Sequence, residues 1–191
     1  MAAGFATGRD LTAAPGAKTV ASPQMEVDSR ATRTDAGQPG TVLLAILATP
    51  LETSGERTLK RLELARQILG FDFVRVVNVL DVPTFRTNGI SIVGKEVLPW
   101  VESQAAISAG LAGCDGVVLG YGVSEPTGAA RLHYRSQIDW LWAELRASRF
   151  LIWSVEMPPR HPSRWHWLTH RLAPDLPFID ALGSVLLPVR A

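Results

Sequence analysis

The feature that most constrains the fold is a series of short apolar runs without alternation of polar and apolar residues. Four of these runs have the length of one strand and a weaker fifth closes the chain; they cover residues 42–47, 74–80, 116–121, 150–155 and 185–189. Continuous apolar runs are typical of strands covered on both faces, as in a parallel sheet. The sequence therefore predicts a sheet with helices on each side.

Stretches with helical spacing of apolar residues lie between these runs, at 58–69, 96–111 and 131–147. The first is expected to end at Gly70. The third is expected to present an apolar face made of Leu132, Ile138, Leu141, Trp142 and Leu145. The alternating order of strands and helices predicts a three-layer α/β/α fold with a central, mainly parallel sheet and right-handed crossovers.

The first 40 residues differ in composition from the rest of the chain. They are rich in Ala, Gly, Thr, Ser, Pro and Asp and show no hydrophobic periodicity. Such a segment buries too little apolar area to offset its ordering entropy, so we expect a disordered tail at 1–40 and one domain at 41–191. Met25 is an alternative start, which would remove residues 1–24 from the native protein.

Composition excludes several classes of protein. The single cysteine, Cys114, excludes a disulfide framework and a thiolate metal cluster, and we interpret it as a residue of a helix–strand junction. The net charge of +1 means that any nucleic acid must be bound by a local patch. No apolar stretch reaches the length of a membrane span and no signal pattern opens the chain. We therefore expect a cytoplasmic protein that has no membrane partner. A monomer is a separate expectation, which these observations do not test.

Polar and aromatic residues gather in the loops that follow the predicted strands, where ligands bind in open α/β sheets. These loops are 48–56, 78–89, 120–124 and 156–167. Residues 131–171 also hold all four histidines, five of the six tryptophans and seven arginines. Arginine–phosphate and aromatic–base contacts are the usual means of binding an unstacked nucleotide, so this region is a candidate nucleic-acid surface. Its Trp165 and Trp167 flank a Pro-rich loop, while Trp140, Trp142 and Trp153 are assigned to the core.

The segment His161-Pro162-Ser163, directly after a predicted strand, resembles the His-Pro-Ser motif of the uracil-DNA glycosylase superfamily. Other loops fall in the matching order: Ala48-Thr49-Pro50 after the first strand, Asn78 after the second and Leu119-Gly120-Tyr121-Gly122 after the third. The chain is also similar to an uncharacterised bacterial and phage family with Pro-Arg-His-Pro near its end, a divergent offshoot of that superfamily. The resemblance covers residues 42 to about 170.

The resemblance implies a uracil-DNA-glycosylase-like fold and a DNA glycosylase activity that flips out a base and excises it without a cofactor or metal, leaving an abasic site. One departure matters for the chemistry. Ala48 and Thr49 stand where the superfamily often carries an acid or Asn, and the nearest carboxylates are Glu52 and Glu56. A reshaped first loop with small residues favours a modified base over plain uracil, such as a hypermodified pyrimidine of phage DNA. The protein would then act in antiviral defence.

The resemblance also assigns roles to residues. His161 is expected to donate to the leaving base, and Asn78 or Asn88 to read the base edge. For the catalytic carboxylate two alternatives stay open: Glu52 takes over the role on a rearranged loop, or the classical chemistry is absent. The remaining substrate contacts are expected from Thr49, Pro50, Leu51, Arg86, Asn88 and Tyr121. The DNA contacts are expected from Ser163, Arg164 and Trp165. An alternative for Ser163 is that it caps a short helix at 164–171.

Two other functions stay open at this point. A metal hydrolase would use His166 and His170, which are four residues apart and share one helix face, but no Glu or Asp lies within that cluster. A non-catalytic nucleic-acid or nucleotide-binding module explains the basic, aromatic region without the missing acid. A dinucleotide-binding enzyme is not favoured, because no glycine pair follows the first strand.

Overall fold

The computed structural model describes residues 40–50, 54–84, 89–122 and 124–190. All of these ranges fall in one structural unit, residues 38–191. The tail predicted at 1–40 lies, apart from Gly40, outside them. So do four candidate site residues, Leu51, Glu52, Arg86 and Asn88.

The described chain contains a five-stranded sheet in the order β2-β1-β3-β4-β5. Its strands are β1 Val42–Leu47, β2 Phe73–Asn78, β3 Gly116–Gly120, β4 Leu151–Val155 and β5 Leu186–Val189. The first four are parallel to one another and β5 pairs antiparallel with β4. The predicted mainly parallel sheet is thus confirmed, and the weak fifth run forms an antiparallel outer strand.

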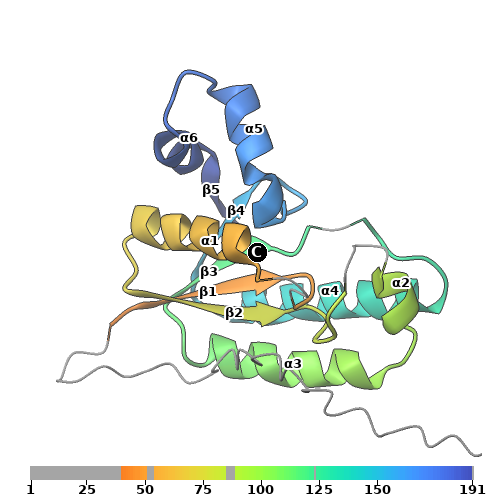
Figure 1. Ribbon diagram of the computed structural model, residues 1–191. Coiled ribbons are helices and arrows are strands. Elements are labelled where there is room, and N and C mark those ends of the chain that lie inside the picture. The colour runs from red at the N-terminus through yellow and green to blue at the C-terminus, as the bar shows by residue number, and fades with distance from the viewer. Residues whose placement is uncertain (1–39, 51–53, 85–88, 123, 191) are drawn as a thin grey trace, which may run out of the picture. The chain divides into compact units, whose positions relative to one another are not determined.

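Helices cover both faces of the sheet (Figure 1). One face carries α1 Glu56–Leu69, α5 Trp165–Leu172 and α6 Phe178–Val185. The other carries α3 Leu98–Leu111 and α4 Ala129–Ala147, with the short α2 Ile90–Val93 beside α4. The predicted three-layer α/β/α architecture is confirmed.

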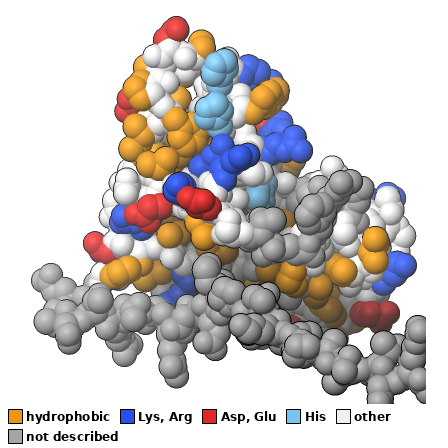
Figure 2. All heavy atoms as spheres, in the orientation of Figure 1, with side chains coloured by type: hydrophobic (Ala, Val, Ile, Leu, Met, Phe, Trp, Pro, Cys, Tyr) orange, Lys and Arg blue, Asp and Glu red, His pale blue; other side chains and the backbone are white. Residues whose placement is uncertain are grey.

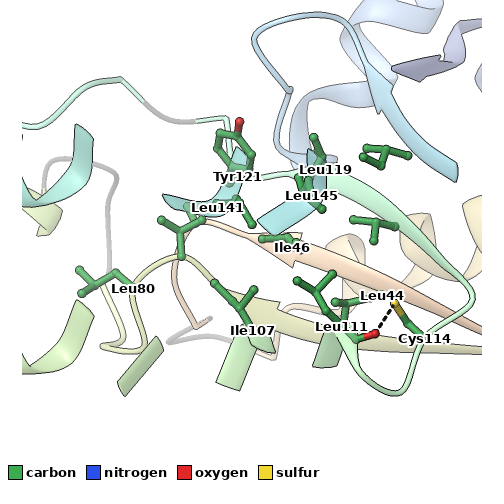
Figure 3. Close-up of a cluster of buried hydrophobic side chains, with 14 of the residues drawn as sticks. Leu44, Ile46, Leu80, Ile107, Leu111, Cys114, Leu119, Tyr121, Leu141 and Leu145 are labelled. Atoms are coloured by element: carbon green, nitrogen blue, oxygen red, sulfur yellow. Dashed lines mark hydrogen bonds between the residues drawn. The ribbon is translucent and has the colours of Figure 1, made fainter. Parts of the chain in front are cut away.

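Alternation along β1 divides the core into two parts. Leu44 and Ile46 face the α3/α4 layer, where they pack with Ile107 and Leu141 (Figure 3). Leu43, Ala45 and Leu47 face the α1/α5/α6 layer. Cys114 lies buried between α3 and β3, as its interpretation as a junction residue requires, and burial raises the pKa of its thiol to about 11.

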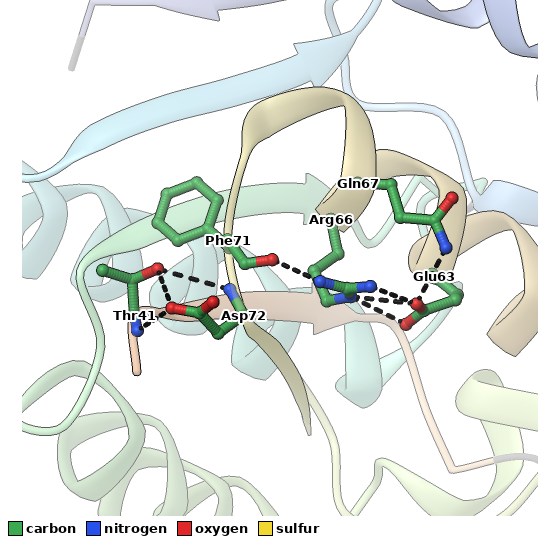
Figure 4. A network of polar contacts seen from close by, with 6 residues as sticks. All are labelled: Thr41, Glu63, Arg66, Gln67, Phe71 and Asp72. Carbon is green, nitrogen blue, oxygen red and sulfur yellow. Dashed lines mark hydrogen bonds and ion pairs between the residues drawn. The ribbon is translucent and has the colours of Figure 1, made fainter. Parts of the chain in front are cut away.

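Polar contacts tie the start of β1 to the connection that leads from α1 into β2 (Figure 4). The backbone N–H and the hydroxyl of Thr41 both donate to Asp72 Oδ2, at 2.7 and 3.0 Å, which lowers the pKa of that carboxyl. Arg66 near the end of α1 pairs with Glu63 and donates to the carbonyl of Phe71. These contacts lie at the amino end of the strands and leave the opposite edge to the loops considered below.

The carboxyl ends of three strands lie side by side, because Leu47 of β1 is in register with Asn78 of β2 and with Gly120 of β3. We refer to this end of the sheet as the sheet edge. The loop after β4 packs against this edge. A Cβ atom added to Gly120 would lie 3.0 Å from Pro162 Cδ, and one added to Gly122 would lie 1.6 Å from the carbonyl oxygen of Pro159. The absence of side chains at these two glycines lets the loop lie directly on the end of β3.

Two local predictions are wrong. Leu132 is 67% exposed, because the buried face of α4 runs through Ala130, Gln137, Leu141 and Leu145 instead. The helix expected at 164–171 begins at Trp165, after a 3₁₀ turn at Pro162–Arg164, and Ser163 does not cap it. The cap of this turn is the His161 ring, which accepts a hydrogen bond from the Ser163 backbone.

Candidate functional site

His161 lies in the loop after β4 with its ring oriented by the residue two positions later. Its Nδ1 is 3.2 Å from the Ser163 backbone nitrogen and 2.8 Å from the Ser163 hydroxyl oxygen. A backbone N–H can only donate, so Nδ1 accepts and the proton of the neutral ring is on Nε2. The Nε2–H group is therefore a donor of fixed direction.

The ring is neutral at physiological pH. Burial, followed by the positive charges of Arg164 and Arg61, lowers the pKa of His161 from 6.5 to about 4. A neutral N–H group polarises an acceptor by hydrogen bonding and does not hand over a proton, because an imidazole that has lost both protons is too basic to form near pH 7. The neutral His161 ring is therefore suited to stabilise developing negative charge on a ligand by donating a hydrogen bond from Nε2–H.

Contacts from two other elements hold this loop at the sheet edge. Arg61 in α1 donates from Nη1 to the carbonyl of Pro162 at 2.7 Å. Pro162 itself is buried against Gly120 at the end of β3. The position of His161 is thus set jointly by α1, β3 and the loop after β4.

Two arginines, Arg61 and Arg164, lie near the histidine, and Arg57 lies near Arg61. Arg61 is half-buried, and burial together with the neighbouring Arg57 lowers its pKa. Within the ranges that the structure describes, Arg57, Arg61 and Arg164 form no ion pair with a carboxylate. Clustered arginines without carboxylate partners form a region of positive potential that favours an anion such as a phosphate.

Asn78 ends β2 at the same sheet edge. Its side-chain oxygen Oδ1 is buried and has no hydrogen-bond partner among the described residues. A buried acceptor without a partner costs on the order of 1–3 kcal/mol, so such groups are rare in folded proteins. Among the described residues, Asn78 Oδ1 is therefore an acceptor whose hydrogen-bonding capacity is unused.

The loops after β1 and β2 are joined by a hydrogen bond between the hydroxyls of Thr49 and Thr84, 3.0 Å apart. Pro50 follows Thr49 and is half-buried. Thr49 and Pro50 therefore stand at the sheet edge with Asn78, while Leu51, Glu52, Arg86 and Asn88 lie outside the described residues.

Tyr121 is placed differently from its prediction as a substrate-binding residue. It is 4% exposed and belongs to the core cluster between the sheet and the α3/α4 layer. Its hydroxyl accepts a hydrogen bond from Trp142 Nε1 at 3.1 Å, and burial raises its pKa to about 12. The ring serves the packing of the core and is not open to a ligand.

Trp165, predicted to stack on DNA, is fully buried between α5 and the sheet. Its Nε1 donates to the carbonyl of Arg160 at 2.8 Å, so its polar group is also satisfied inside the protein. In a helix that begins at Trp165, residues 165, 168 and 169 share the inward face. Ser163 and Arg164, the other predicted DNA contacts, are exposed beside His161.

Trp167 is a surface residue to which the sequence assigned no role. It is 56% exposed, and the guanidinium carbons of Arg160 and Arg171 lie 5.9 and 4.8 Å from its ring centroid. The spacing of Trp165, Leu168 and Thr169 is the signal that distinguishes the two tryptophans. Because 165 is on the inward stripe, 167 must point outward.

His166 and His170 share a face of α5, as their spacing predicts, and their rings stack with centroids 6.3 Å apart. In the part of the chain that the structure describes, no group of three His, Cys, Asp or Glu residues is placed to hold a metal ion. Within the described residues, no third metal ligand therefore lies beside His166 and His170 to support the metal-hydrolase alternative.

Among the described residues, no helix is both long and apolar enough to cross a membrane.

Comparison of the chain with protein-family models, curated proteins and solved structures finds no match.

Proposed function

We propose that the protein is a DNA glycosylase that binds an extruded base at the carboxyl edge of the sheet and hydrolyses its N-glycosidic bond. The observation that carries the proposal is the neutral His161 ring, held by Ser163 with its Nε2–H group as donor. The enzyme would act on DNA as a monomer in the cytoplasm.

The chemistry follows from where charge develops during the reaction. Cleavage of the bond places positive charge on the sugar and negative charge on the leaving base. A neutral, oriented N–H donor stabilises the second charge more strongly in the transition state than in the ground state, so it lowers the barrier. His161 would act through this hydrogen bond and not as a general acid, because its pKa is only about 4.

A carboxylate beneath the sugar is the second group that this reaction requires. Of the described carboxylates in the neighbouring loops, Glu56 is paired with Lys60 and Glu156 with Arg160, and Asp81 belongs to the loop after β2 and not to the loop after β1. We therefore retain Glu52, in the loop after β1, as the proposed carboxylate that stabilises the sugar and orients water.

Base recognition is assigned to Asn78, whose buried Oδ1 would accept from an N–H group on the base. Ser163 and Arg164 would contact the adjacent phosphate. Since Ala48 and Thr49 are small, the proposed substrate is a bulky modified base, and a hypermodified pyrimidine of phage DNA would place the enzyme in antiviral defence.

The test is incubation of the full-length protein with DNA duplexes and single strands carrying modified or unmodified pyrimidines. Alkali-labile sites and release of the free base, measured by mass spectrometry, are expected for a modified substrate. Equal inactivity on every substrate, with the protein folded, contradicts the proposal.

A second function is favoured by the cations alone. Arg57, Arg61 and Arg164 supply an anion site that needs no catalytic acid, as a non-catalytic nucleic-acid or nucleotide-binding module would use. Binding of DNA without any alkali-labile product would support this function over the glycosylase.

A further inference from the structure

The outward face of α5 carries aromatic and basic side chains. Because Trp165, Leu168 and Thr169 are buried, the exposed positions of this helix hold His166, Trp167, His170, Arg171 and Leu172. None of them is acidic. We refer to His166, Trp167, His170 and Arg171 as the α5 surface.

A row of aromatic rings connects the α5 surface to the loop of His161. Arg61, which holds the Pro162 carbonyl, lies with its guanidinium carbon 5.8 Å from the ring of Phe178 in α6. Phe178 lies 5.6 Å from His166, and His166 stacks on His170. Figure 2 shows histidine and basic side chains close together on this face of the molecule. The row therefore leads from the candidate site out along α5.

Trp167 forms the second half of this surface. More than half of its ring is open to solvent although two guanidinium groups are beside it. Arg160 is held by Glu156, whereas Arg171 forms no ion pair with any residue in the described ranges. An exposed indole next to an arginine that forms no ion pair in the described ranges offers a stacking platform and a phosphate contact side by side.

Helix electrostatics explain only part of this composition. His170 and Arg171 are in the last turn of α5, where positive charge interacts favourably with the helix dipole. The dipole gives no reason for an exposed tryptophan, or for a histidine in the first turn. The apolar and cationic features together fit a partner with flat rings and negative charge.

We propose that the α5 surface binds the single-stranded DNA that flanks the nucleotide held at His161, with a base stacked on Trp167 and a phosphate at Arg171. Single-stranded DNA is the occupant favoured by the observations, because only unpaired bases present their ring faces to an indole. The inference rests on the proposed function, since it assumes that a DNA base enters the site at His161.

The experiment measures binding of a fluorescent, unmodified single-stranded DNA of mixed sequence to the full-length protein by anisotropy at several salt concentrations. Trp167→Ala is expected to weaken binding by about 5- to 100-fold, because a base loses its stacking partner. Arg171→Gln is expected to weaken binding several-fold and to reduce the slope of log K against log salt by about 0.7, which is the loss of one phosphate contact.

Matched controls are Leu172→Ala, an exposed apolar residue of the same helix, and Arg146→Gln, an exposed arginine of α4 on the other side of the sheet. Both should bind as the parent protein does. Unchanged binding in the Trp167 and Arg171 variants overturns the inference, as does tighter binding of duplex DNA or of RNA of the same sequence. Because the DNA is unmodified and no cleavage is scored, these outcomes are separate from failure of the glycosylase assay.

Discussion

The backbone N–H of Ser163 donates to Nδ1 of His161 across 3.2 Å, although only Pro162 separates the two residues. The contact caps the 3₁₀ turn at Pro162–Arg164 and determines which ring nitrogen carries the proton. One short segment thus orients its own donor. The rest of the protein has to place that segment at the sheet edge.

Catalysis is expected to depend on His161 and Glu52. Under single-turnover conditions with a cleavable substrate, His161→Ala and Glu52→Gln should each reduce the rate of base release by about 10²-fold or more. Ser163→Ala should have a smaller effect, because the backbone donor to Nδ1 remains. Glu56→Gln is the control and should be unchanged, since Glu56 is exposed and its ion pair within the described residues is with Lys60. Parent-like rates in both the His161 and Glu52 variants would remove these assignments.

The pH dependence of stability is expected to carry the contribution of His161. Because its pKa is about 4 in the folded protein and 6.5 in the unfolded chain, the unfolded chain binds a proton in this interval that the native state does not. Stability therefore falls as pH drops through this window, by about 2 kcal/mol between pH 7 and pH 5.

Urea unfolding at pH 7 and pH 5 measures this difference. In His161→Gln the loss between the two pH values should shrink by about the same 2 kcal/mol. His170→Gln, which removes an exposed ring from the neighbouring helix, controls for the loss of a histidine. Equal acid sensitivity of the His161 variant and the parent protein would show that the ring is not buried as a neutral group.

The two tryptophans of α5 are expected to differ sharply in their contribution to stability. Trp165 is fully buried, so Trp165→Ala should reduce the free energy of unfolding by about 3–5 kcal/mol. Trp167→Ala should change it by about 0.5 kcal/mol or less, because the ring is exposed. Chemical denaturation of both variants is sufficient, and a large loss in the Trp167 variant would place that ring in the core.

Gly122 is expected to tolerate no side chain. A Cβ atom there would lie 1.6 Å from the Pro159 carbonyl oxygen, so Gly122→Ala must displace the loop that carries His161. We expect a loss of about 1–3 kcal/mol in urea unfolding. Gly183→Ala is the matched control: it lies in α6 with its nearest contact at 3.7 Å, and alanine there should stabilise the helix by up to about 1 kcal/mol. Equal stability of the two variants would contradict the contact.

The sequence by itself determined the five strands and the helices α1, α3 and α4, because the periodicity of apolar residues is a local property, whereas α2 and α6 were not predicted. The run Val42–Leu47 was a strand and the stretch up to Leu69 a helix in the prediction and in the structure. The regular alternation of such elements also predicted a three-layer architecture, since the connections between parallel strands have few alternatives. The loop 156–167 was selected as a candidate site from its position after a strand, and its His-Pro-Ser segment from a resemblance to a family motif.

Only the tertiary structure decided which side of each element faces inward near the site. Tyr121 and Trp165 are buried because the end of β3 and the start of α5 pack against particular neighbours, Trp142 and the Arg160 carbonyl among them. Likewise, the pKa of His161 depends on burial and on Arg61, a residue far away in the sequence. Local spacing can separate the two faces of α5, but the burial of Tyr121 and the pKa of His161 sum over contacts between distant parts of the chain, so no local pattern contains them.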